Sequence, residues 1–281
     1  MSRTPPVALT IAGSDSGGGA GLQADLRTFT TCGVHGCVAV TAVTVQNTLG
    51  VSGVVEIPPN TVADQIRAVV VDIGVGAVKT GMLASSSIIK AVAGVCDEAG
   101  IGAGGIGAGS IGVGTPFVVD PVAASMHGDQ LLADDALDAL RTELLPRATL
   151  VTPNLDEVRL LVDIDVRSRE QQYEAARALF TLGPQWVLVK GGHLHDDPEC
   201  VDLLHDGTNF VELIGPRFNT PHTHGGGDAL AAAITAALAH GSAVPDAVAH
   251  GKRYVEQAVA HSYPLGAGVG PVSPFWRVRL D

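Results

Sequence analysis

Basic residues and aromatic rings are both scarce in this sequence. Its 281 residues include 17 Lys and Arg against 29 Asp and Glu, a formal net charge of −12, and aromatic residues make up only 4%. A surface that binds nucleic acid or an anionic membrane needs a basic patch, and none is visible. We therefore expect no nucleic acid and no membrane among the partners. Any phosphate should be held by backbone N–H groups, a metal ion and a few isolated cations.

Cysteine pairs and long apolar runs are missing as well. The four cysteines form no CxxC pair, and no basic and apolar signal segment precedes them. No apolar stretch reaches about 18 residues without a charge or a glycine cluster, which argues against a membrane span. The sequence thus predicts a cytoplasmic protein with reduced thiols.

Hydrophobic residues make up 46% of the chain, mainly Val, Ala, Leu and Ile, which is typical of a parallel sheet buried on both faces. Apolar, β-branched runs alternate with segments of helical period, the pattern of βα units. Strands are expected at residues 7–13, 37–45, 76–80, 116–120, 148–152 and 186–190, with 51–57 as an extra edge strand. Helices are expected at residues 20–32, 61–72, 85–99, 130–145, 155–162, 169–182, 226–240 and 245–262. No linker divides the chain, so we expect one domain over residues 1–281.

Two stretches interrupt this alternation. Asp206-Gly207 lies between two apolar runs from about residue 199 onward and predicts a β-hairpin. Residues 100–114 contain 8 glycines in 15 positions. A cofactor loop is one interpretation, but the stretch has no cation or acid, so we expect a flexible insertion.

Two glycine motifs resemble nucleotide sites only weakly. Gly19, Gly21 and Ala24 satisfy G-x-G-x-x-A, yet the second strand ends in Gln46 and Asn47 rather than in the acid that a dinucleotide site needs. The segment GVGAVKTG resembles a Walker A loop but lacks the glycine before its lysine. That lysine, Lys79, stands in mid-strand, where an ion pair and a functional role are both open.

Polar residues follow the expected strand ends, where ligands bind in open parallel sheets. Asp120 closes one strand. Asn154 can cap the helix after the next strand, and Glu157, three residues on, can complete a capping box or face a metal. Lys190 ends a further strand beside two glycines. The neighbouring histidines, at positions 193, 195, 222 and 224, lack metal-ligand spacing and are expected to be loop residues.

The stretch THGGGDALAAAI, residues 223–234, joins three glycines to an apolar helix. Glycines before a helix let backbone N–H groups turn toward an anion, and the helix N-terminus adds roughly half a positive charge. The stretch therefore predicts a phosphate site. Asp228 lies in the first turn, where it can stabilise the helix dipole or take a proton from a hydroxyl that attacks the bound phosphoryl group.

Several motifs together resemble the ribokinase superfamily and, within it, the hydroxymethylpyrimidine/phosphomethylpyrimidine kinases of thiamine biosynthesis. The resemblance spans nearly the whole chain. It is carried by ALTIAGSDSGGGAGLQADL, TAVTVQNT, VKTGML, VVDPV, LVTPNLDE, VLVKGGH, HTHGGGDAL and GVGPVSPFW. It implies a doubly wound, mostly parallel α/β sheet with helices on both faces and a small edge-strand flap. It also implies a homodimer that uses ATP and Mg²⁺ to phosphorylate hydroxymethylpyrimidine and then its monophosphate.

The resemblance also implies a substrate site. Asp25 and Gln46 would hydrogen-bond the aminopyrimidine, and Gly13 and Met82 would line its pocket. A carboxylate or amide oxygen suits an exocyclic amine, and an N–H donor suits a ring nitrogen.

By the same resemblance, Asp120 and Glu157 would position Mg²⁺ through waters. Lys190 would meet the nucleotide phosphates, and Asn154 and Thr223 would also bind the nucleotide.

Gly225, Gly226, Gly227 and Asp228 would form the anion hole. The family usually carries cysteine after these glycines, whereas this chain has aspartate, as in sugar kinases of the superfamily. The insertion at 100–114 is a second departure from the family pattern.

Two other functions stay open. A pyridoxal kinase of the same fold also acts on a small aromatic ring with a hydroxymethyl group, although the QNT and QADL segments favour pyrimidine. A binding protein without turnover is the alternative of another class, and the joint presence of Asp228, Glu157 and Lys190 argues against it.

Overall fold

The computed structural model describes residues 4–102, 114–123, 131–192, 194 and 199–278. The chain forms two compact units, one of Met1–Leu83 with Phe218–Asp281 and one of Ala84–Arg217. Most of the glycine-rich insertion, as well as His193 and His195, lies outside the described residues. The expectation of one domain over the whole chain stays a prediction.

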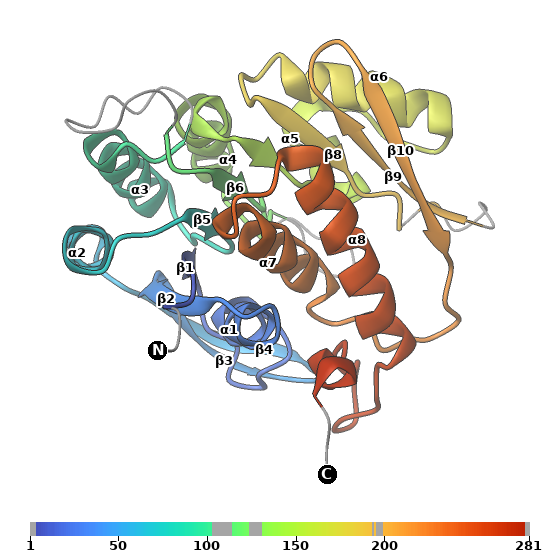
Figure 1. Ribbon diagram of the computed structural model, residues 1–281, viewed down its shortest axis with the longest axis horizontal. Helices are drawn as coiled ribbons and strands as arrows, with labels where there is room; N and C mark the ends of the chain where they lie inside the picture. Colours follow the sequence, from blue (N-terminus) through green and yellow to red (C-terminus); the bar gives the residue numbers. More distant parts are fainter. Residues whose placement is uncertain (1–3, 103–113, 124–130, 193, 195–198, 279–281) are drawn as a thin grey trace. The chain divides into compact units, whose positions relative to one another are not determined.

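The first unit is built on three parallel strands (Figure 1). β1 (Val7–Ala12) lies between β2 (His35–Val40) and β5 (Ala77–Thr80) and is parallel to both. All of β1 after Val7 is buried, as expected for a strand covered on both faces. The apolar run that predicted this strand therefore reflects burial on both sides.

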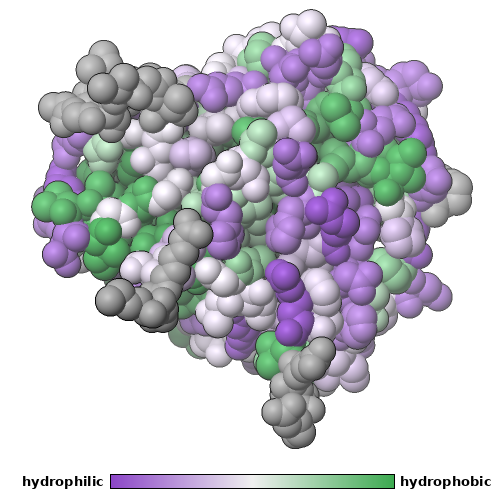
Figure 2. Space-filling model, in the orientation of Figure 1, coloured by the Kyte–Doolittle hydropathy of each residue, from purple (hydrophilic) through white to green (hydrophobic). Residues whose placement is uncertain are grey.

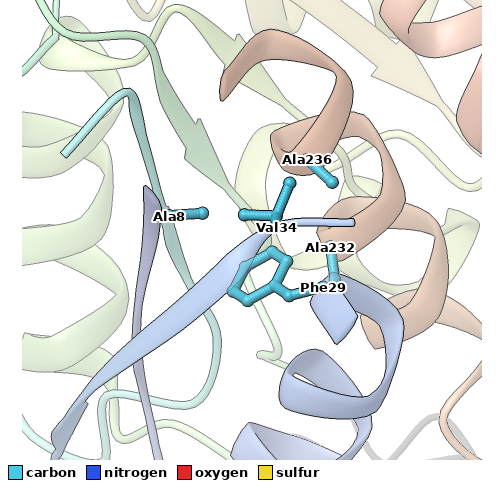
Figure 3. Packing of buried hydrophobic residues seen from close by; sticks show 5 residues of the cluster. All are labelled: Ala8, Phe29, Val34, Ala232 and Ala236. Carbon is cyan, nitrogen blue, oxygen red and sulfur yellow. The ribbon is translucent and has the colours of Figure 1, made fainter. Parts of the chain in front are cut away.

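Helix α7 is the central helix of this unit. It contacts β1, β5 and α1, and it runs beside α8. Its alanine side chains allow close packing, and Ala232 and Ala236 meet Phe29 of α1, Ala8 of β1 and Val34 in a buried cluster (Figure 3). The helices of the unit are α1 (Gly21–Thr31), α2 (Pro59–Asp72), α7 (Gly226–Ala239) and α8 (Val244–Ala260), with a 3₁₀ turn, η3 (Pro274–Arg277).

A small antiparallel flap, β3 (Ala42–Asn47) with β4 (Gly50–Glu56), completes the first unit. The prediction of one strand over 37–45 is wrong, because the chain leaves the parallel sheet at Thr41, whose amide donates to the Ala12 carbonyl. The predicted extra strand is confirmed as β4, but it pairs with β3 in a sheet of its own.

The second unit contains a mixed sheet. β6 (Phe117–Val119), β7 (Leu150–Val151) and β8 (Trp186–Val189) are parallel, and β9 (Glu199–His205) and β10 (Phe210–Pro216) follow as antiparallel strands. The predicted hairpin is confirmed.

The geometry of the turn explains why the sequence Asp206-Gly207 predicts a hairpin. Asp206 accepts hydrogen bonds from the amides of Thr208 and Asn209, and Gly207 has a φ of +91°.

The helices of the second unit largely match expectation. They are α3 (Ser86–Ala99), α4 (Asp134–Ala139), α5 (Leu155–Val162) and α6 (Arg169–Phe180). The helix expected over 130–145 begins at Asp134, and beyond α4 the chain stays helical but changes type, to a π-helical turn, η1 (Leu140–Leu144), and a 3₁₀ turn, η2 (Leu145–Arg147). Pro146 explains the change, because a proline lacks the amide hydrogen that a continuing helix needs.

Mostly parallel strands flanked by helices confirm the predicted α/β class. Across the described ranges, no helix combines the length and the apolarity that crossing a membrane requires. Figure 2 shows a hydrophobic, green area over α2. Near the C-terminal end of this helix, Val71 is 86% exposed and Ile73 is half exposed.

Candidate functional site

The loop before α7 needs glycine for steric reasons. Gly225 caps the helix with a φ of +75°, and a Cβ atom there would lie 2.0 Å from the carbonyl oxygen of Gly19. No side chain fits at that distance. The first glycine loop of the sequence therefore packs directly against the start of α7.

The first amides of α7 differ in what they bind. The Gly226 amide donates to the Thr223 carbonyl at 3.1 Å. Helical geometry leaves the amides of Gly227 and Asp228 without a carbonyl one turn earlier in the helix. These two amides and the helix dipole can hold an anion, whereas the Gly226 amide already has an acceptor.

A buried polar chain connects the sheet to Asp228. Lys79, in the middle of β5, is completely buried, and its Nζ donates to Oδ1 of Asp25 at 2.7 Å. The Thr10 hydroxyl donates to the other oxygen of Asp25 at 2.6 Å. On its other side, Lys79 Nζ lies 3.6 Å from Oδ1 of Asp228, whose side chain is 16% exposed.

The Asp25 carboxylate is not placed where a ligand could reach it directly. Burial raises its pKa to about 7, with the nearby Asp228 acting in the same direction and Lys79 and Thr10 opposing. Both of its oxygens have protein partners and its side chain is fully buried, so contact with a pyrimidine would require this pair to open. For Lys79, the structure shows the ion pair that the sequence left open.

The other expected substrate residues lie on the loops after β1 and β5 and on the flap. The Gly13 amide donates to the Met82 carbonyl at 3.1 Å, and a Cβ at Gly13 would lie 2.5 Å from the Met82 methyl carbon. Gln46, half-buried on β3, is held through its backbone, which exchanges hydrogen bonds with the Ser16 hydroxyl. Gly13 and Met82 are thus brought together, as expected.

Asp15 and His224 join the two glycine loops through a contact that no sequence pattern indicates. The Asp15 carboxylate accepts hydrogen bonds from the amides of Gly17, Gly19 and Ala20 and from His224 Nε2 at 3.0 Å. Burial raises the pKa of Asp15, but the bonds from His224, Ala20 and Gly17 outweigh it and hold the pKa below its usual value. A contact between residues 209 positions apart leaves no local sequence pattern.

A second cluster lies at the strand ends of the other unit. Lys190, after β8, places Nζ 3.0 Å from Oδ1 of Asp120 and 4.0 Å from Oε2 of Glu157. The Thr152 hydroxyl also donates to Oδ1 of Asp120 at 3.0 Å. Both carboxylates are buried, so their interaction with Lys190 is weakly screened by solvent.

Glu157 forms the predicted capping box at the start of α5. Its amide donates to Oδ1 of Asn154, and its Oε2 accepts from the Asn154 amide at 2.8 Å. The Ala123 amide donates to Oε1. Burial raises the pKa of Glu157 to about 7, Asp120 adds to the rise, and Lys190 opposes it.

The donor set of this unit suits one kind of metal binding. Among the described residues, no group of three or more His, Cys, Asp or Glu side chains could hold a metal ion. Two carboxylates beside a cation instead fit Mg²⁺, which usually keeps several waters and binds one or two carboxylates and substrate phosphates. Of the four histidines considered as metal ligands, the two that the structure describes have other partners: His222 accepts from the Gly270 amide, and His224 contacts Asp15.

Comparisons with known proteins agree on one family. The family model of phosphomethylpyrimidine kinase matches residues 15–273. The hydroxymethylpyrimidine/phosphomethylpyrimidine kinase of Mycobacterium tuberculosis is 59% identical over 275 residues, which cover 98% of this chain and 96% of that protein.

Solved structures show the same fold. The pyridoxal kinase of Bacillus subtilis in its ADP complex is 35% identical with a TM-score of 0.87, covering 98% of this chain and 100% of that one. The phosphomethylpyrimidine kinase of Clostridium difficile is 36% identical with a TM-score of 0.77, covering 90% and 99%. The family resemblance is therefore confirmed, and the chain belongs to the phosphomethylpyrimidine kinase family.

Proposed function

We propose that this enzyme phosphorylates 4-amino-5-hydroxymethyl-2-methylpyrimidine to its monophosphate and then to its diphosphate, in thiamine biosynthesis. The observation that carries the proposal is a carboxylate, Asp228, in the first turn of α7 beside amides that can hold a phosphoryl group. The family match and the 59% identical kinase support it. ATP is the phosphoryl donor, in keeping with the ADP complex of the related pyridoxal kinase.

The first unit supplies the chemistry of the attacking group. Asp228 accepts the proton of the hydroxymethyl group as its oxygen attacks the terminal phosphorus of ATP, and ADP leaves. The amides of Gly227 and Asp228 donate hydrogen bonds to the transferred phosphoryl group, and the helix dipole adds to the attraction. Gly13 and Met82 line the pyrimidine pocket, and Gln46 binds the ring from the flap.

The second unit supplies residues for the nucleotide. Lys190 binds nucleotide phosphates, and Asp120 and Glu157 hold Mg²⁺ through waters. The ion neutralises phosphate charge when it is bound. Asn154 and Thr223 are further proposed nucleotide contacts. In a chain of net charge −12, Lys190 and the metal offset repulsion of the polyphosphate.

Pyridoxal is the second candidate substrate, because a pyridoxal kinase matches the fold with a TM-score of 0.87. An ATP-consumption assay with hydroxymethylpyrimidine, its monophosphate and pyridoxal side by side, with product masses recorded, tests both. We expect kcat/KM for hydroxymethylpyrimidine to exceed that for pyridoxal. A higher value for pyridoxal would reverse the assignment, and binding of the pyrimidine without any turnover would indicate a binding protein.

We propose a cytoplasmic homodimer that forms through the flap. Valines on β3 and β4 are about half exposed or more, including Val45 at 60% and Val55 at 65%. Exposed apolar sheet surfaces of this kind mark interaction sites, and the family resemblance implies a dimer. Sedimentation should therefore give a dimer mass, and Val55→Lys should give a monomer. A wild-type monomer at micromolar concentration would overturn the proposal.

A further inference from the structure

Lys79 occupies a position that the fold alone does not explain. It stands in mid-strand, fully buried, on a strand whose other residues are apolar apart from Thr80. Burying an ion pair usually gains little stability, because desolvation of both charges offsets their attraction. Two apolar side chains of similar volume would serve packing at least as well. A charged pair at this site therefore suggests a role other than packing.

The contacts of Lys79 hold its ammonium group next to Asp228. Asp25 holds the ammonium group at 2.7 Å and is itself oriented by Thr10. The ammonium group then lies 3.6 Å from the partly exposed carboxylate of Asp228. A Cβ atom at Gly81 would lie 3.8 Å from both Lys79 Nζ and Asp228 Oδ1, so the chain after β5 passes directly beside their contact.

We infer that Lys79 is a positioning residue for Asp228, and that Asp25 is the anchor that holds Lys79 in place. The inference rests on the proposed function, in which Asp228 takes the proton of the substrate alcohol. The fixed ammonium group, 3.6 Å from Oδ1 of Asp228, restricts the carboxylate to one orientation, which assists proton transfer.

The inference reassigns Asp25, for which the family resemblance implies a substrate contact. An anchor carboxylate is buried and bonded to the protein through both oxygens, as Asp25 is. A substrate contact would instead leave one oxygen facing the ligand. The two roles therefore differ in whether loss of Asp25 raises KM for the pyrimidine.

The test compares Lys79→Met with wild type in the two phosphoryl transfers, measured separately. In the first transfer we expect kcat to fall about 10- to 100-fold with little change in KM, because the base is less well oriented. In the second transfer, where the attacking phosphate is already deprotonated, the loss should be several-fold at most.

A double variant, Asp25→Leu with Lys79→Met, guards against misfolding from an unpaired buried carboxylate. We expect it to fold and to show the same loss in the first transfer, with KM for the pyrimidine unchanged. Lys252→Met is the matched control, because Lys252 is also buried, on α8 and 4.0 Å from Glu256, and should leave both transfers normal.

Three outcomes overturn the inference. They are an unchanged kcat in the first transfer, equal losses in both transfers, and a large rise in pyrimidine KM in the double variant alone, which would return Asp25 to substrate binding. Failure of the proposed function is recognised separately, because wild-type enzyme would then not phosphorylate the pyrimidine alcohol at all.

Discussion

At the residue scale, Asp228 is the side chain whose importance should differ most between the two transfers. The first nucleophile is a neutral alcohol, for which a carboxylate base contributes about 10²- to 10⁴-fold. The second is a phosphate monoester with a second pKa near 6, mostly deprotonated at neutral pH, so it needs no base. Asp228→Asn should therefore reduce formation of the monophosphate far more than formation of the diphosphate. Single-turnover measurements of each step give the comparison.

A matched control separates base catalysis from the helix dipole. Asp246 lies in the first turn of α8 and is exposed, so Asp246→Asn removes a similar dipole interaction and should leave both steps unchanged. Equal losses in both steps for Asp228→Asn would mean that Asp228 organises the anion site and accepts no proton.

The sequence predicts single residues well where their partners are close in the chain. Asn154 and Glu157 are three positions apart, and this spacing indicates a capping box or a metal contact for Glu157; the structure contains the capping box. Asp25 and Lys79 are 54 positions apart, and only the fold brings them into contact. The residue types of Asp25 and Lys79 and their expected burial do not show that the two side chains form an ion pair.

At the scale of elements, the same distinction separates the strands from the loops. Apolar runs located β1, β5 and β8, because a strand buried on both faces has a compositional signature. The break between β2 and β3 was missed, because apolar residues continue across Thr41 and only the hydrogen bonding changes partner. The contact of Asp15 with His224 was equally invisible, although it joins two loops that the sequence did identify.

That contact gives a prediction for the first glycine loop. Asp15→Ala removes the acceptor of three backbone amides and the partner of His224. We expect the free energy of unfolding to fall by roughly 2–4 kcal/mol, because buried donors lose a charged acceptor. Since Gly19 packs against Gly225, KM for ATP or for the pyrimidine should rise as well. Chemical denaturation and steady-state kinetics measure the two effects.

Asp206→Ala is the control for this variant. Asp206 also accepts hydrogen bonds from backbone amides, and these bonds lower its pKa to about 2, but it lies in the solvent-accessible turn between β9 and β10. Its replacement should leave KM unchanged. An Asp15→Ala enzyme with normal KM values would show that the loop keeps its shape without the carboxylate.

At the scale of the whole molecule, buried carboxylates make folding stability depend on pH. The pKa of Glu157 is about 7 in the folded chain and about 4.5 when unfolded. The folded state therefore binds the proton more tightly, and this contribution to stability is complete below about pH 4.5 and lost as pH rises through about 7. Asp25 acts in the same direction. His250 acts in the opposite one, because burial lowers its pKa.

Glu157→Gln isolates the contribution of one carboxylate from these opposing ones. Glutamine keeps an oxygen for the capping box but does not titrate. As pH rises from roughly 5 to 8, the free energy of unfolding of the variant should therefore increase relative to that of wild type by about 1–3 kcal/mol. Chemical denaturation of both proteins across this range measures the difference. If Glu157 also holds Mg²⁺, the variant should need more Mg²⁺ for half-maximal rate. A difference in stability that stays constant with pH would mean that Lys190 keeps Glu157 ionised throughout, because the ion pair would then outweigh burial.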